Sequence, residues 1–141
     1  MTTHIGAKPG DIAELCAIAE PTHGLITNIG KAHLEGFGGL DGVVRTKTEL
    51  YDHLRSCKGI AFVHGDDPLL MAKSAGLKRV TYGLGADHDT CGGPDDDATL
   101  YLHVHFADRQ RSGRRYLETQ LVGAYNVPNV LAAVCAGQHF R

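Results

Sequence analysis

Short apolar runs alternate with stretches of helical periodicity, and this alternation limits the chain to a small number of folds. Strand-like runs are expected at residues 24–29, 59–63 and 79–83. Helical patterns fill the intervals, at residues 11–20 and 42–56 and from residue 66 onward. Strands and helices that alternate in this way predict an α/β fold, in which a mostly parallel sheet carries helices on its faces.

The last third of the chain has a different character. Residues 86–97 are polar, acidic and glycine-containing, and we expect them to form an exposed loop. Residues 100–106 and 115–122 alternate like half-buried strands around a turn, which predicts an antiparallel hairpin. A final helix is expected to begin near Asn126. No linker divides the sequence, so residues 1–141 are expected to form one domain or part of one.

Composition argues against several kinds of partner. The formal net charge is −2 at pH 7, and no basic cluster with interleaved aromatic residues is present, so we expect no nucleic-acid partner. The apolar runs are too short to span a bilayer, and the N-terminus lacks the apolar segment of a signal peptide. The four cysteines are far apart, which favours free thiols in a reducing cytoplasm over a zinc site or a disulfide framework.

Lys47 is the residue whose position is hardest to explain by folding alone. On the helix expected at 42–56 it shares one face with Val43, Leu50 and Leu54. A lysine in an apolar stripe is costly unless it is paired or chemically changed. One interpretation is that the stem packs while the ammonium reaches water. The other is that the amine is desolvated and acts as a nucleophile or takes up carbon dioxide as a carbamate.

Two further positions are candidates for ligand binding. His33 lies in a glycine-rich stretch just after an expected central strand, at the sheet edge where open α/β sheets bind ligands. Asn126 and Asn129, next to Tyr125, fall at the start of the last helix. The histidine is equally compatible with a loop residue of no role, and Asn126 with simple helix capping. Two carboxamides at a helix start are also able to read the edge of an adenine.

These segments resemble the Mur ligase family in their order and in their residues, over essentially the whole chain. The resemblance rests on Pro21-Thr22-His23-Gly24-Leu25-Ile26-Thr27-Asn28-Ile29-Gly30-Lys31-Ala32-His33-Leu34-Glu35-Gly36-Phe37-Gly38, Gly42-Val43-Val44-Arg45-Thr46-Lys47-Thr48-Glu49-Leu50, Gly65-Asp66-Asp67 and Gly123-Ala124-Tyr125-Asn126-Val127-Pro128-Asn129. The run from Ala32 to Gly38 is most similar to the D-alanyl-D-alanine-adding branch. The matching part of the family is its central, ATP-binding domain.

The resemblance implies a chemistry. ATP would phosphorylate a carboxylate of a UDP-N-acetylmuramoyl-peptide, and D-alanyl-D-alanine would attack the acyl phosphate to form an amide in peptidoglycan precursor synthesis. By the same resemblance His33 and a carbamylated Lys47 would bind Mg²⁺, and Tyr125, Asn126 and Asn129 would lie at the adenine. Carbamylation would convert the costly lysine into a metal-paired anion.

The sequence departs from the family pattern in several places. No GxxxxGK[ST] phosphate loop occurs in the printed chain, and His4-Ile5-Gly6-Ala7-Lys8 stands where the family has a magnesium-binding glutamate. His64 stands where an asparagine is usual. The family's N-terminal UDP-binding domain and its C-terminal domain have no counterpart in these residues. We therefore expect no ligase turnover from the 141-residue chain alone.

Two alternatives follow from these departures. The chain is also compatible with another Mur-type ligase or a folylpolyglutamate-synthase-like enzyme, because substrate choice resides largely in the other domains. A catalytically dead nucleotide-binding or interaction module would keep the fold without the chemistry. The phosphate loop and His4 departures favour this second alternative.

Overall fold

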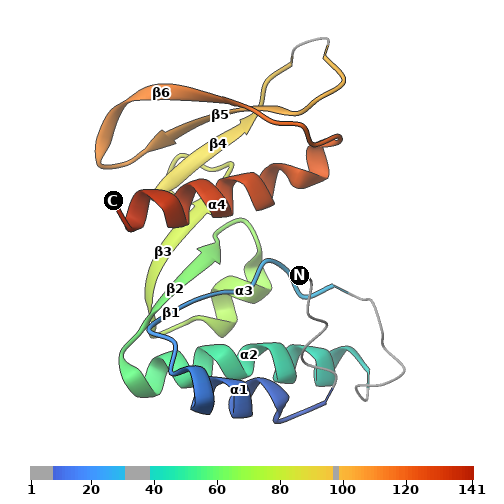
Figure 1. Cartoon of the computed structure of the whole chain (residues 1–141), viewed down its shortest axis with the longest axis vertical. Helices are drawn as coiled ribbons and strands as arrows, with labels where there is room; N and C mark the ends of the chain where they lie inside the picture. Colours follow the sequence, from blue (N-terminus) through green and yellow to red (C-terminus); the bar gives the residue numbers. More distant parts are fainter. Residues whose placement is uncertain (1–7, 31–38, 97–98) are drawn as a thin grey trace.

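A single six-stranded sheet organises the molecule, as seen in a computed structural model that describes residues 8–30, 39–96 and 99–141 (Figure 1). The strands lie in the order β1-β2-β3-β4-β5-β6. Neighbours are parallel from β1 to β4 and antiparallel from β4 to β6. The strands are β1 (His23–Leu25), β2 (Ile60–His64), β3 (Lys78–Gly83), β4 (Thr90–Pro94), β5 (His103–Asp108) and β6 (Arg111–Glu118). The predicted α/β class and hairpin are confirmed.

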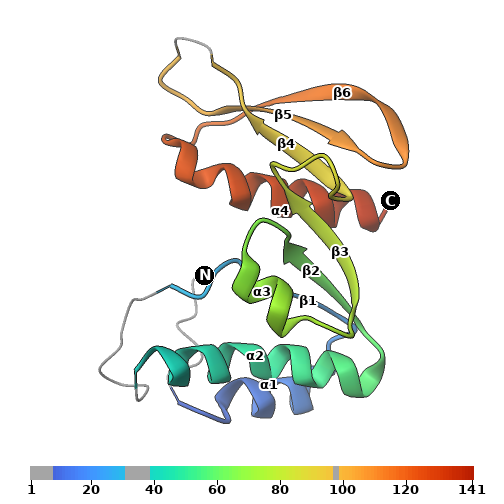
Figure 2. The same cartoon turned by 180° about the vertical axis from the view of Figure 1, so that it is seen from behind.

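Helices cover both faces of this sheet, so the core has two halves. The helices are α1 (Asp11–Ala19), α2 (Leu40–Cys57), α3 (Pro68–Lys73) and α4 (Val127–His139), with a 3-10 turn at Ala124–Asn126 before α4. Ala61 and Val63 of β2 belong to the cluster that α2 and α3 cover, whereas Phe62 belongs to the cluster under α4. Successive side chains of a strand point to opposite faces, so α4 lies on the face away from α2 and α3, as the opposed views show (Figure 2).

Two helix starts are stabilised by carboxylates. The backbone N–H of Gly10 donates to Glu49 Oε1 at 2.7 Å and that of Ala13 to Glu49 Oε2 at 2.9 Å, so a side chain of α2 caps α1. Asp67 Oδ1 accepts from the N–H groups of Leu69 and Leu70 at the start of α3. These contacts satisfy N–H groups that a helix leaves unpaired.

Three details of the sequence prediction are wrong. The expected loop at 86–97 contains β4, because β3 and β5 pair with it from both sides although its sequence Thr-Cys-Gly-Gly-Pro has little strand propensity. The run at 24–29 forms ladder pairs only through His23–Leu25, although Ile26 is buried. Helix α2 begins at Leu40 with Gly39 in the N-cap position, before the expected start at residue 42.

None of the described helices is long and apolar enough to cross a membrane.

Candidate functional site

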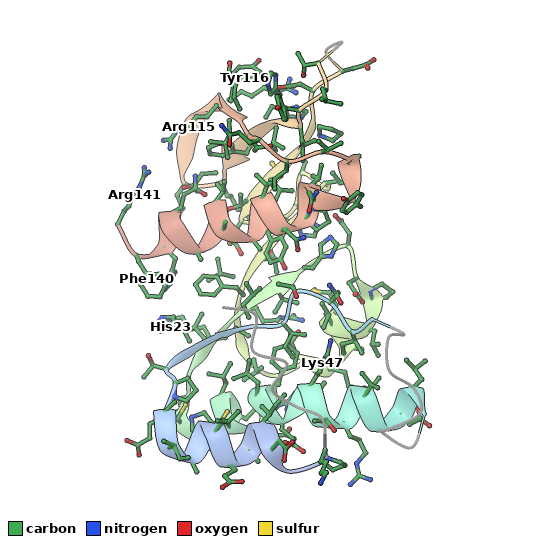
Figure 3. All side chains as sticks on the ribbon, turned by 45° about the vertical axis from the view of Figure 1, so that its right-hand side comes forward. His23, Lys47, Arg115, Tyr116, Phe140 and Arg141 are labelled. Atoms are coloured by element: carbon green, nitrogen blue, oxygen red, sulfur yellow. The ribbon has the colours of Figure 1, made fainter. Side chains whose placement is uncertain are left out.

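Lys47 lies half-buried on α2, and its side chain points toward the segment that follows β1 (Figure 3). Its Nζ donates a hydrogen bond to the carbonyl of Asn28 at 3.0 Å. Val43 and Leu54 of the predicted apolar face are buried and Leu50 is half-buried. The predicted placement of Lys47 within an apolar helix face is therefore confirmed, and the ammonium ends at the carboxyl side of β1.

His33 lies outside the described residues, so its predicted place beside Lys47 stays a prediction. The described chain comes up to this segment from both sides, at Gly30 after β1 and at Gly39 before α2.

A second polar cluster lies at the same sheet edge, where β2 and β3 end. Asp66 Oδ1 is 2.9 Å from His88 Nε2, and Asp66 Oδ2 is 3.6 Å from His64 Nε2. Asp66 Oδ2 also accepts from the backbone N–H of Leu84 at 2.6 Å. The His64 ring stacks on Tyr82 with centroids 5.4 Å apart. One carboxylate thus ties together the ends of two parallel strands and the loop that carries His88.

Glycine is required for this cluster to close. A Cβ atom on Gly65 would lie 2.1 Å from His88 Cε1, and one on Gly83 would lie 2.4 Å from Asp66 Oδ2. Distances this short are severe overlaps, so any side chain at Gly65 or Gly83 would displace the His88–Asp66 pair.

The hydrogen bonds of Asp66 change its acidity. Burial raises the pKa of the carboxyl, but hydrogen bonds from His88 and the Leu84 N–H, with the nearby imidazoles, outweigh burial and leave the pKa below 3.8. A carboxyl with a lowered folded-state pKa stabilises the fold above its unfolded pKa, and this contribution is lost as the pH falls through the folded value.

We therefore expect the free energy of unfolding of the unmodified chain to fall more steeply with acidification below pH 3.8 than that of Asp66→Asn. Urea unfolding followed by circular dichroism at a series of pH values measures this slope. His88→Gln, which keeps the carboxyl but removes the imidazole, should have an intermediate slope. Equal slopes in all three proteins would contradict the assignment.

The start of α4 holds the third candidate group. Asn126 occupies the N-cap position, but its side chain makes no capping hydrogen bond and donates from Nδ2 to the carbonyl of Val122 at 3.0 Å. The capping interpretation of Asn126 is therefore wrong. Tyr125 is 80% exposed, and Asn129 lies at the rim of a pocket between α4 and the β5–β6 hairpin. Tyr125, Asn126 and Asn129 thus each keep polar atoms or a ring face that a ligand could contact.

The fold places Lys47 and the Asp66 cluster at the same sheet edge, although no hydrogen bond or ion pair among the described residues joins the two. Parallel strands β1, β2 and β3 end at one edge of the sheet, which is where open α/β sheets bind ligands. Asn28 follows β1 and Asp66 follows β2 at this edge. Within the described ranges no hydrogen bond or ion pair joins Lys47 to Tyr125, Asn126 or Asn129. A ligand contacted by both groups would have to span the gap between α2 and α4.

The position of His88 at this edge was not predicted from the sequence. His88 falls in a polar stretch with no periodicity, and only the fold of the β3–β4 loop brings it to Asp66. The Gly65-Asp66-Asp67 run resembles a family motif, but the sequence does not show that its two aspartates have different contacts. Asp66 binds His88, whereas Asp67 caps α3.

Comparison with known proteins gives a consistent result. The family model described as "Mur ligase middle domain" matches residues 6–137. The UDP-N-acetylmuramoyl-tripeptide–D-alanyl-D-alanine ligase of Mycobacterium leprae (strain TN) is 34% identical over 143 residues, which cover 92% of this chain and 27% of that protein. The enzyme of the same name from Escherichia coli (strain K12) is 40% identical over 132 residues, covering 88% and 28%.

Solved structures show the same relationship. The MurF ligase from Thermotoga maritima in complex with ADP superposes with a TM-score of 0.80 at 25% identity, over 96% of this chain and 31% of that one. A MurF structure from Acinetobacter baumannii gives a TM-score of 0.77 at 27% identity, over 94% and 29%. The chain thus spans about 27% of the length of the curated relatives it matches first.

Proposed function

Because the chain belongs to the Mur ligase middle-domain family, we propose that it is the nucleotide-handling part of an ATP-dependent ligase that adds D-alanyl-D-alanine to UDP-N-acetylmuramoyl-tripeptide. The observation that carries the proposal is Lys47, held half-buried at the carboxyl edge of the sheet by the Asn28 carbonyl. The names of several relatives, including those from Mycobacterium leprae and Escherichia coli, support the substrates.

The proposed reaction has two steps. The γ-phosphoryl group of ATP passes to the tripeptide carboxylate, which gives an acyl phosphate and ADP. The amine of D-alanyl-D-alanine then attacks the acyl carbon, the new amide bond forms, and phosphate leaves. Such reactions depend on positioning and on neutralising phosphate charge. In this scheme Asn126, Asn129 and Tyr125 contact the adenine region, and the ADP-bound neighbour supports the use of a nucleotide.

Magnesium fits this edge only if Lys47 is modified. The Lys47 ammonium is a cation and would repel the metal, whereas its carbamate would offer an oxygen ligand of the kind Mg²⁺ prefers. The described residues contain no group of three histidine, cysteine or acidic side chains placed to hold a metal. We propose that carbamylated Lys47 and His33 hold Mg²⁺, which would neutralise phosphate charge. UDP-linked substrates and free thiols are consistent with a cytoplasmic enzyme.

A chimera tests the proposal. Residues 6–137 replace the aligned segment of the Bacillus subtilis relative, which is 30% identical over 131 residues. We expect ADP release that requires both UDP-N-acetylmuramoyl-tripeptide and D-alanyl-D-alanine, and that L-alanine does not support. A cooperative thermal transition would verify that the chimera folds. A folded chimera without turnover, or with ADP release indifferent to D-alanyl-D-alanine, would contradict the proposal.

A further inference from the structure

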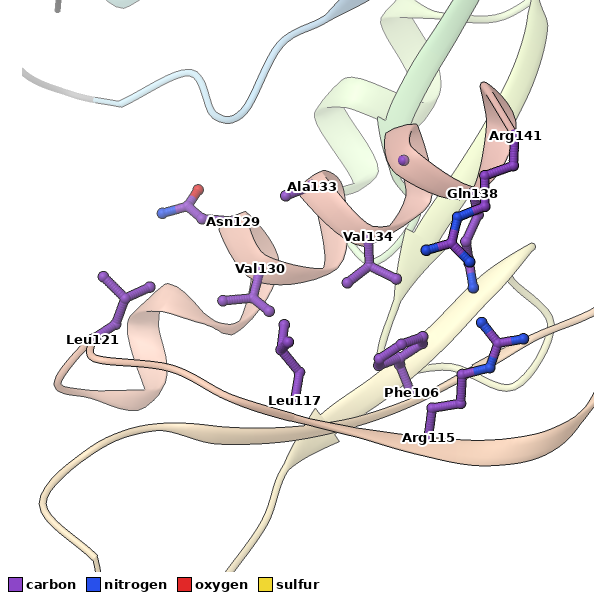
Figure 4. A pocket seen from close by; sticks show the side chains of 11 residues that line it. Phe106, Arg115, Leu117, Leu121, Asn129, Val130, Ala133, Val134, Gln138 and Arg141 are labelled. Atoms are coloured by element: carbon purple, nitrogen blue, oxygen red, sulfur yellow. The ribbon is translucent and has the colours of Figure 1, made fainter.

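A mostly apolar pocket lies between α4 and the β5–β6 hairpin, away from Lys47, and has a volume of about 480 Å³ (Figure 4). Its apolar wall comes from the hairpin, from α4 and from the segment between them: Phe106, Leu117, Leu121, Val130 and Val134. Pockets of this volume with a mostly apolar lining and a few convergent polar groups are typical of small-molecule sites.

Two guanidinium groups lie together at one end of this pocket. Arg115 and Arg141 approach each other there, whereas Leu121 and Asn129 lie at the other end (Figure 4). Arg115 is half-buried and shares the α4-facing side of the hairpin with Phe106, to which it is paired across the strands, and with Leu117. A cation on an otherwise apolar inner strand face is unfavourable unless an anion accompanies it.

Among the described residues, no carboxylate side chain accompanies these two guanidinium groups. No aspartate or glutamate lines the pocket, and neither Arg115 nor Arg141 forms an ion pair or side-chain hydrogen bond in the described part of the chain. Gln138, also in the lining, accepts from the Thr90 hydroxyl through Oε1 but leaves its buried Nε2 without an acceptor. The side-chain groups left without a partner at this end, the two guanidinium groups and the Gln138 Nε2, are therefore all donors.

From this arrangement we infer that the pocket binds a small organic anion, with a carboxylate, sulfonate or phosphate at Arg115 and Arg141 and an apolar ring or short chain against Phe106, Leu117 and Val134. Bidentate contact with guanidinium groups is the geometry that such anions favour. The pocket volume of about 480 Å³ lies within the range of small-molecule sites. The inference does not depend on ligase activity.

Paired fluorescent probes test it in the purified chain. 8-Anilinonaphthalene-1-sulfonate carries an anion on an apolar body, and N-phenyl-1-naphthylamine has the same body without the charge. We expect Arg115→Gln to weaken sulfonate-probe binding about tenfold while leaving the neutral probe unchanged. Arg114→Gln is the matched control, because Arg114 lies on the opposite strand face over Tyr116 and should not change either affinity.

A substitution that fills the pocket tests the inference independently of the arginine substitutions. A Cβ atom on Gly137 would meet nothing within 4 Å, so Gly137→Phe should fold and abolish binding of both probes. Unchanged binding in Gly137→Phe, or equal losses in Arg115→Gln and Arg114→Gln, would overturn the inference. Displacement of the sulfonate probe by MgATP would overturn it by assigning the pocket to the nucleotide site. A dimer in light scattering that Gly137→Phe dissociates would overturn it in favour of a second copy.

Discussion

Gly92→Ala is expected to lower the free energy of unfolding by about 3 kcal/mol, the upper end of the usual cost of overpacking. A Cβ atom at this position would lie 2.2 Å from the carbonyl oxygen of His105 and 2.9 Å from Phe106 Cα. Both are backbone atoms of β5, so a rotamer change cannot relieve the overlap. The β4–β5 pairing must open, and Leu131 of α4, 3.0 Å from the same Cβ position, must also move.

A glycine-to-alanine substitution at Gly137 should instead raise the free energy of unfolding. Gly137 lies within α4, where an added Cβ meets nothing within 4 Å. Alanine in a helix interior is favoured over glycine by roughly 0.5–1 kcal/mol, so Gly137→Ala should raise stability. Urea denaturation followed by far-ultraviolet circular dichroism measures both changes. A Gly92→Ala chain as stable as the unmodified one would show that β4 does not pack against β5 as described.

Local pattern was sufficient to predict the first three parallel strands, β1 to β3, and helix α2. The apolar run at 59–63 became β2 because its side chains are buried on both faces, and the face of α2 that carries Lys47 followed from helical periodicity. These elements were predictable because their pattern and their burial agree.

The missed features depend on contacts between distant segments. Strand β4 consists of residues with little strand propensity, and its existence depends on two neighbours. The capping of α1 by Glu49, over 36 residues, and the His88–Asp66 pair, over 22 residues, have no local signature. The lack of a side-chain cap at Asn126 could not be predicted, because its amide reaches back to Val122 and a carboxamide at a helix start satisfies either geometry.

The placement of Lys47 leads to the second large expected effect. If its amine carries a carbamate that holds Mg²⁺, Lys47→Ala in the Bacillus subtilis chimera should lower turnover at least about 100-fold, the scale of losing a group that positions a metal. Lys73→Ala is the matched control, since Lys73 is an exposed lysine in the last turn of α3, and it should turn over at the rate of the unmodified chimera.

Dependence on carbon dioxide separates a carbamate from an ordinary structural lysine. A structural ammonium bound to the Asn28 carbonyl would be indifferent to dissolved carbon dioxide, whereas a carbamate forms from it. The decisive measurement is therefore ADP release by the chimera in buffer depleted of carbon dioxide and then resupplied with bicarbonate. We expect turnover to fall and recover when Lys47 is present, and to stay low and insensitive to bicarbonate in Lys47→Ala. Turnover by Lys47→Ala equal to that of the unmodified chimera would contradict it.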